Sequence, residues 1–135
     1  MLKRMIIYVV ICSFAFLNGC GKEPTKQISE QHIETKTIGN PTAQEVLRMD
    51  SNANIFMYKD TIYNAGVPWV DELKLTKGIQ VTEITHQSNN GKAFNNGSAN
   101  KLEVGTKIFR VKERNDILIA ETGRGDIRFY QLVEG

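Results

Sequence analysis

The amino-acid sequence predicts a small α+β domain, in which an antiparallel β-meander sheet of about six or seven strands carries two short helices. Three observations lead to this fold class. Apolar and β-branched runs alternate with turn residues throughout 107–133. Two neighbouring aromatic and β-branched runs occupy 55–64. The segments 41–49 and 67–73 have apolar residues at helical spacing instead. A small curled barrel is the alternative architecture.

The first predicted helix runs from Pro41 to about Met49. Asn40 can accept hydrogen bonds from the free N–H groups at a helix start, and proline suits the first helical position. Ile55–Tyr58 and Thr61–Asn64 then predict a β-hairpin. Its link, Lys59-Asp60, is unfavourable for the primed turns of two-residue hairpins, so a wider loop is also compatible with the sequence.

A second helix is predicted over 67–73, because Pro68 stands near its start and acidic residues follow in the first turns. It contains Trp69, the only tryptophan of the chain. A core anchor and a ligand-stacking residue are both open interpretations of Trp69, and burial is favoured because tryptophan is highly buried on average. The alternation in 79–85 predicts a half-buried strand, with Ile79 and Val81 facing one side.

The segment 86–101 is rich in Asn, Gly and Ser and is predicted to be a long loop. A loop of this length inside a compact domain is either functional or disordered. Recognition residues are often carried by loops on a rigid sheet, so Phe94, Asn95 and Asn96, together with Trp69, are the candidate ligand or partner contacts. Removal of 89–98 is expected to preserve the fold.

The C-terminal part is predicted to form consecutive strands joined by turns, over 107–112, 117–121 and 127–133. In the first of these strands, Phe109 and Val111 are expected to face the core. The same alternation places Ile108 on the opposite, solvent-facing side of the strand, either exposed or covered by a helix.

The N-terminal segment has the organisation of a secretory signal. Lys3 and Arg4 precede an uncharged apolar run, Met5–Leu17. This run is shorter than the roughly 20 apolar residues that span a membrane comfortably. A basic start, a short apolar run and a small residue before the cut are typical of a signal peptide, here residues 1–19.

The residues at the end of this segment are more specific. Leu17-Asn18-Gly19-Cys20 resembles the lipobox of bacterial lipoproteins, although Ala or Ser is commoner at the second position. The resemblance implies transfer of a diacylglyceryl group to the Cys20 sulfur and cleavage after Gly19. Membrane lipid is then the partner through Cys20, and the protein lies on the extracytoplasmic face of the cell membrane. A plain signal peptide or an uncleaved anchor is the alternative.

The composition of the chain limits the possible partners and disulfide bonds. Residues 1–19 hold two of the 17 basic residues and none of the 15 acidic ones, so the mature chain is close to neutral. This balance does not suggest nucleic acid as a partner. Cys20 would be the only remaining cysteine, which excludes an intrachain disulfide. Residues 20–40 are predicted to be the lipidated cysteine and a flexible tether, and 41–135 a single α+β domain.

The chain also resembles small lipoproteins of Gram-positive bacteria, in which an aromatic hairpin (Ile55–Tyr63) precedes a strand like Gly105–Phe109 and a C-terminal meander. No active-site residues can be transferred from that resemblance. The sequence shows no metal-spaced cluster and no catalytic set, so we expect no cofactor, no catalytic residues and no metal, and favour a binding module for an unknown envelope protein or ligand. A cell-envelope hydrolase, with carboxylates from Glu83 and Asp116 or Glu121, and a purely structural surface protein are the alternatives.

Overall fold

The computed structural model describes residues 39–134, so the predicted signal peptide, Cys20 and most of the predicted tether lie outside the described residues. No helix among the described residues is long and apolar enough to cross a membrane. The elements are α1 (Ala43–Met49), β1 (Ile55–Tyr58), β2 (Thr61–Ala65), α2 (Pro68–Asp71), β3 (Lys77–Glu83), β4 (His86–Gln87), the 3₁₀ helix η1 (Gly91–Ala93), β5 (Ser98–Ala99), β6 (Lys107–Val111), β7 (Ile117–Thr122) and β8 (Gly125–Gln131).

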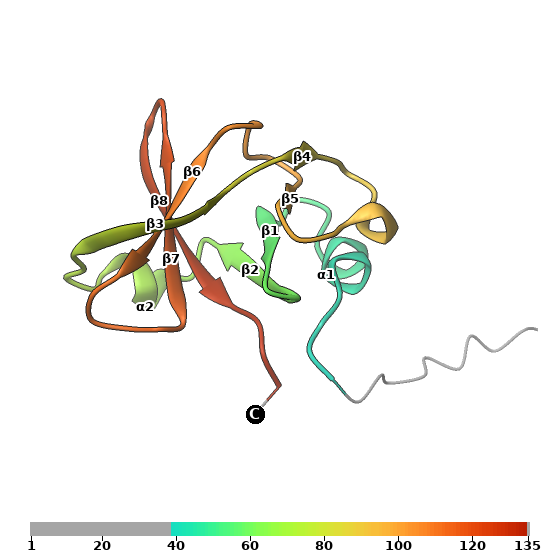
Figure 1. The fold of residues 1–135 in the computed structure, drawn as a ribbon. Helices are drawn as coiled ribbons and strands as arrows, with labels where there is room; N and C mark the ends of the chain where they lie inside the picture. Colours follow the sequence, from blue (N-terminus) through green and yellow to red (C-terminus); the bar gives the residue numbers. More distant parts are fainter. Residues whose placement is uncertain (1–38, 135) are drawn as a thin grey trace, which may run out of the picture. The chain divides into compact units, whose positions relative to one another are not determined.

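The strands form one curled sheet of eight strands in the order β3-β6-β7-β8-β2-β1-β5-β4 (Figure 1). The two outermost strands, β3 and β4, are consecutive in the chain and are joined by Ile84-Thr85. Ile84 N–H donates to the Thr106 carbonyl at 2.9 Å, while Thr85 N–H donates to the Gly97 carbonyl at 2.9 Å. The sheet therefore bends until its two ends meet at this connection. The predicted α+β class is confirmed.

All strand pairs are antiparallel except β4 and β5, which pair in parallel. The predicted meander corresponds to β6, β7 and β8. The two additional strands β4 and β5 come from the segment 86–101, which the sequence predicted to be a loop. They are only two residues long and lack the apolar alternation by which a strand is recognised.

The concave side of the sheet is filled by the main core. Phe56 stacks on Tyr63 with ring centroids 5.3 Å apart and meets Phe129 edge-to-face at 4.9 Å. Burial raises the pKa of the Tyr63 hydroxyl. The other buried members of this core are Ile84, Ala99, Leu102, Ile108, Leu118 and Ala120.

The convex side is covered by the two helices at separate places. Ile55 and Ile62 belong to a cluster with Ala43 of α1, while Ile117 and Ile119 belong to another with Val70 of α2. Successive side chains of a strand point to opposite faces. The strands β1, β2 and β7 therefore contribute to the core on both faces, which explains the continuous apolar runs of β1 and β7 in the sequence.

The start of α1 differs from the prediction. Thr42, not Asn40, caps the helix: its side-chain oxygen accepts from Glu45 N–H at 3.2 Å, and Thr42 N–H donates to Glu45 Oε2 at 2.8 Å. This reciprocal capping box satisfies two N–H groups at once, which one asparagine cannot do. Asn40 Oδ1 instead accepts from Glu134 N–H at 3.3 Å, joining the two ends of the described chain.

The β1–β2 hairpin is present, and the possibility of a wider loop is excluded. Lys59 and Asp60 alone form the turn, with φ of 49° and 59°. Both lie in the left-handed region that a type I′ turn requires. Asn96 holds this turn from outside, since its Oδ1 accepts from Asp60 N–H at 2.8 Å and its Nδ2 donates to Asp60 Oδ1 at 3.0 Å.

The predicted orientation of β6 was wrong for Ile108, which is fully buried in the main core. Phe109 is half-buried on the other face, with Lys77 Nζ 5.0 Å from its ring centroid. The register of β3 against β6 shifts twice, between Lys77 and Gln80 and between Gln80 and Thr82. Such bulges break the simple alternation, and Ile79 is consequently 73% exposed.

Candidate functional site

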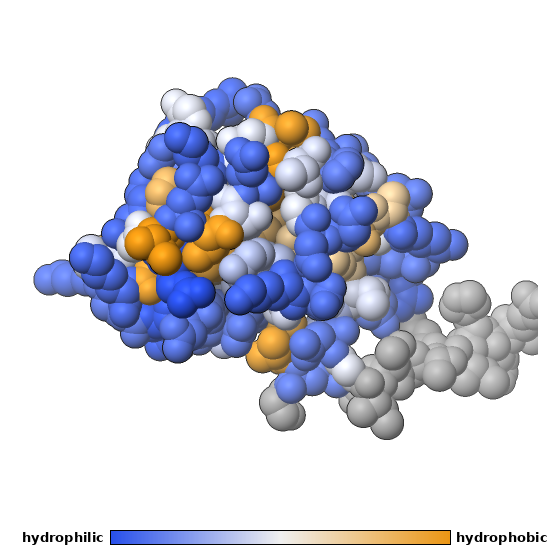
Figure 2. Space-filling view, viewed as in Figure 1, coloured by the Kyte–Doolittle hydropathy of each residue, from blue (hydrophilic) through white to orange (hydrophobic). Residues whose placement is uncertain are grey.

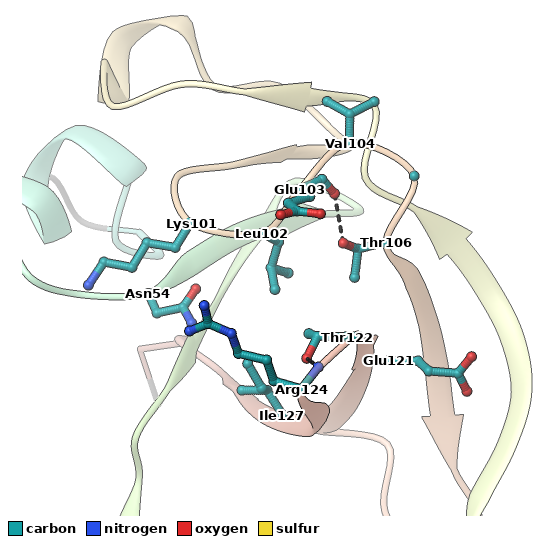
Figure 3. Close-up of a pocket in the computed structure, with 12 residues that line it drawn as sticks. Asn54, Lys101, Leu102, Glu103, Val104, Thr106, Glu121, Thr122, Arg124 and Ile127 are labelled. Atoms are coloured by element: carbon teal, nitrogen blue, oxygen red, sulfur yellow. Dashed lines mark hydrogen bonds between the residues drawn. The ribbon is translucent and has the colours of Figure 1, made fainter.

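A pocket of about 820 Å³ lies at one end of the curled sheet (Figure 3). Three chain segments that are distant in sequence meet there: residue 54 just before β1, the loop 101–106 before β6, and the turn between β7 and β8. The volume falls within the ~300–1,000 Å³ typical of small-molecule sites, which often lie in the mouths of barrels.

The inner part of the pocket is apolar. Leu102, which is buried in the main core, and the half-buried Ile127 of β8 line it. Val104 is also a lining residue and is 62% exposed. Figure 2 shows that apolar side chains on the viewed face form small groups separated by polar surface. The pocket therefore combines apolar lining residues with the charged residues Lys101, Glu103 and Arg124.

Asn54 and Arg124 each bring to the pocket a polar group that has no partner in residues 39–134. The Asn54 Oδ1 atom is buried and accepts no hydrogen bond. The Arg124 guanidinium makes no hydrogen bond or ion pair with the described residues, and it extends toward the side of the pocket where Asn54 lies (Figure 3). An unpaired guanidinium that lines a pocket is available to an anionic or polar ligand, whereas the Asn54 Oδ1 atom is too deeply buried to reach one.

The backbone around Arg124 is well defined. Arg124 N–H donates to Thr122 Oγ1 at 3.2 Å, and the same hydroxyl donates to the Gly125 carbonyl at 2.6 Å. Gly125 has a φ of +116°, a conformation that side chains disfavour. The conformation of the turn is therefore fixed by its own residues, while the Arg124 side chain remains available for contact with a ligand.

The loop 101–106 supplies a second cation and an acid. Lys101 Nζ donates to the Asn52 carbonyl at 2.6 Å and keeps further donors. The Glu103 carboxylate makes no hydrogen bond or ion pair with residues 39–134, whereas its backbone carbonyl accepts from Thr106 Oγ1 at 2.7 Å. Gly105 N–H donates to the Ile84 carbonyl at 2.7 Å, so the loop is tied to the connection between β3 and β4.

The carboxylates considered for a hydrolase are not gathered in this pocket. Glu121 lines it but points away from the other side chains (Figure 3) and pairs with Lys77 Nζ at 2.7 Å. Asp116 pairs with Arg114 through two hydrogen bonds of 2.8 and 2.6 Å, which lower the pKa of its carboxyl group. Glu83 is exposed at the end of β3. Among residues 39–134, no cluster of three His, Cys, Asp or Glu side chains could hold a metal ion.

The structure corrects the predicted burial of Trp69, whose surface is 43% exposed. Val70, the next residue of α2, takes the core position instead. The indole ring meets Tyr130 edge-to-face at 5.0 Å, and the Arg114 guanidinium lies 5.2 Å from its centroid. Trp69 therefore lies on the surface between two neighbours of its own chain.

The other candidate contact residues also have partners within the domain. Phe94 packs against the cluster under α1. Asn95 Oδ1 accepts from Ser98 Oγ at 2.9 Å, and Asn96 binds Asp60 as described above. The segment 86–101 is thus an ordered part of the fold, with Ser98 and Asn100 buried. Contrary to the sequence-based expectation, we expect removal of 89–98 to disrupt the domain.

Sequence analysis did not identify Asn54, Arg124 or Leu102 as site residues. They are far apart in the chain, and each has a common turn or core role when considered alone. One signal was nevertheless present: residues before β1, before β6 and after β7 all fall at the same end of an antiparallel arrangement.

Comparison of the chain with protein families, with curated proteins and with solved structures finds no match. The site must therefore be interpreted from its own geometry.

Proposed function

We propose that this protein is a lipid-anchored, extracytoplasmic binding protein whose ligand occupies the pocket at the end of the curled sheet. The lipobox-like residues Leu17 to Cys20 support the anchor and the location. The pocket supports the binding role, because it combines an apolar floor with a few polar groups, as ligand sites do.

The observation that carries the proposal is the Arg124 guanidinium, which lines the pocket without a hydrogen bond or ion pair to residues 39–134. In a pocket that Leu102 and Ile127 also line, it offers a partly apolar anion a charge-assisted hydrogen bond together with apolar contact. Asp116 and Glu121, in contrast, are already occupied by Arg114 and Lys77, which favours binding over the hydrolase alternative.

The position of the chain ends is compatible with this role. β8 begins at Gly125 beside the pocket and runs to Gln131 at the other end of the sheet (Figure 1). Beyond it, Glu134 N–H donates to Asn40 Oδ1. A seven-residue strand spans roughly 20 Å, so residue 40 lies well away from the pocket. A chain anchored through Cys20 would therefore leave the pocket accessible.

Site-directed cross-linking in living cells tests the proposal. A photoreactive benzophenone residue replaces Val104 at the pocket, and the matched control carries it at Met49 on α1, which is 83% exposed. We expect a discrete adduct from position 104 that is lost when Arg124→Ala is added, and no such adduct from position 49. Equal adduct patterns from both positions, or an adduct unaffected by Arg124→Ala, would contradict the proposal.

A further inference from the structure

We propose that the ligand of this pocket is a zwitterion, in which an apolar body joins a carboxylate to an ammonium group. This inference rests on the proposed function, because it names the charge and polarity of the ligand in the same pocket. Two oppositely charged side chains carry it, since Glu103 and Arg124 line one pocket and do not pair with each other.

The backbone holds these two charges in separate segments. The Glu103 carbonyl accepts from Thr106 N–H at 3.1 Å and from Thr106 Oγ1 at 2.7 Å. Gly105 N–H ties the same loop to the connection between β3 and β4. Arg124 belongs to the turn that Thr122 fixes on another side of the pocket (Figure 3). The two side chains therefore do not neutralise one another, and the pocket between them is open to a ligand.

Each charge is available to one end of such a ligand. The unpaired guanidinium of Arg124 can bind a carboxylate through two parallel hydrogen bonds. The Glu103 carboxylate makes no hydrogen bond or ion pair with residues 39–134, so it can accept from an ammonium group. Lys101 does not occupy Glu103, because its Nζ donates to the Asn52 carbonyl at 2.6 Å.

A ligand with a single charge fits this arrangement less well. A simple anion would pair with Arg124 but would be repelled by Glu103. A simple cation would be repelled by Arg124 and Lys101. A zwitterion meets an opposite charge at both ends, and complementarity of this kind acts chiefly on specificity.

The part of the ligand between its charges is expected to be apolar. In Figure 3 the Leu102 side chain lies between the loop that carries Glu103 and the turn that carries Arg124, and Ile127 lines the same pocket. Burial of methylene groups against these two side chains favours binding. Ammonium group, apolar body and carboxylate are thus each matched by a group of this chain.

Heteronuclear NMR of the full chain in detergent micelles tests the ligand class. The probes share one unbranched hydrocarbon chain: ε-aminocaproate carries both charges, caproate only the negative one and hexylammonium only the positive one. We expect ε-aminocaproate to shift amide signals of 102–106 and 122–124. It should bind about fivefold more tightly than either singly charged probe, as expected for one additional exposed ion pair.

Two variants separate the ends of the ligand. Glu103→Gln should remove the advantage of ε-aminocaproate over caproate without weakening the binding of caproate. Arg124→Gln should weaken the binding of both carboxylate probes about tenfold, without weakening that of hexylammonium. The matched controls Glu72→Gln and Arg110→Gln alter exposed residues outside the pocket and should change no affinity.

Several results would overturn the ligand class. They are equal or tighter binding of a singly charged probe, an advantage of ε-aminocaproate that survives Glu103→Gln, shifts confined to other residues, or no shift up to about 10 mM ε-aminocaproate. The cross-linking experiment separates the two proposals. An adduct at position 104 without a preference for the zwitterion would mean that the pocket is functional and the ligand class is wrong. Loss of both would remove the proposed function as well.

Discussion

Asn100 and Ile55 exchange two hydrogen bonds: Asn100 Oδ1 accepts from Ile55 N–H at 2.8 Å, and Asn100 N–H donates to the Ile55 carbonyl at 3.1 Å. Asn100 Nδ2 also donates to the Ala53 carbonyl at 2.7 Å. The buried asparagine thus takes the place of a neighbouring strand at the start of β1. It also fixes the backbone next to Asn54, which belongs to the pocket.

Replacement of Asn100 by alanine should therefore destabilise the domain by about 2–4 kcal/mol, because a buried N–H and a carbonyl lose their partners. Urea denaturation followed by circular dichroism measures the change. The control is Asn89→Ala, since Asn89 is exposed in the same segment and should tolerate alanine within about 0.5 kcal/mol. Equal stability of the two variants would show that the Asn100 side chain is dispensable.

Gly97 should not tolerate a side chain. Its φ is +93°, and an added Cβ would lie 2.5 Å from Thr85 Oγ1. Gly97→Ala is expected to cost more than about 2 kcal/mol, from backbone strain and the displaced threonine. Gly123→Ala is the matched control, because nothing lies within 4 Å of the position of its Cβ. The measurement is the thermal unfolding midpoint of both variants. An unchanged midpoint for Gly97→Ala would contradict the observed packing.

Arg128 holds the end of α2 to the sheet. Its Nη1 lies 2.8 Å from the Val70 carbonyl, 3.1 Å from that of Asp71 and 2.6 Å from that of Leu73. Arg128→Met should cost about 1.5–3 kcal/mol, as expected for lost hydrogen bonds to a charged group. Loss of these contacts should loosen α2 and expose Trp69 further to water. Because Trp69 is the only tryptophan and belongs to α2, the fluorescence emission of the folded variant should shift to the red.

The control for this experiment is Arg110→Met, which removes an exposed arginine from β6. Its stability and tryptophan emission should match those of the unmodified protein. If Arg128→Met behaved in the same way as this control, the contacts to α2 would be energetically unimportant.

Asp116 should contribute stability that depends on pH. Its pKa is lowered in the folded state, chiefly by the hydrogen bonds from Arg114. The contribution is thus fully present above the unfolded-state pKa of about 4 and is lost as the pH falls through the lower folded-state pKa. Asp116→Asn should be less stable than the unmodified protein near pH 7, and the difference should shrink toward about pH 3. Urea midpoints across this range measure it, and a difference that is constant with pH would rule out the ion pair as the cause.

Cys20→Ser tests the proposed anchor. Serine cannot accept the diacylglyceryl group, so the variant should leave the detergent phase in a phase-partition assay and lose the mass of the lipid. Cys12→Ser, within the predicted signal peptide, is the control and should change neither property of the mature protein. Retention of Cys20→Ser in the detergent phase would point to a different attachment.

Secondary-structure elements were predicted best where they depend only on residues close together in the chain. Apolar and β-branched runs separated by turn residues identified β6 to β8, and the aromatic hairpin was located correctly even though its turn residues were considered unsuitable. Trp69 and Ile108 were assigned to the wrong surroundings, because the face that is buried depends on where α2 packs and on the bulges opposite β6. The 86–101 segment was taken for a loop, since buried polar contacts such as those of Ser98 and Asn100 leave no apolar pattern.

The amino-acid sequence by itself determined the α+β class, the hairpin boundaries and the expectation of a lipidated Cys20, because each depends on residues close together in the chain. Only the tertiary structure decided that Asn54, Leu102 and Arg124 share one pocket. Their meeting follows from the curling of the sheet, which brings together the starts and ends of strands separated by tens of residues. Strand order and curvature arise from non-local pairing and from packing on both faces, and no short stretch of sequence encodes them.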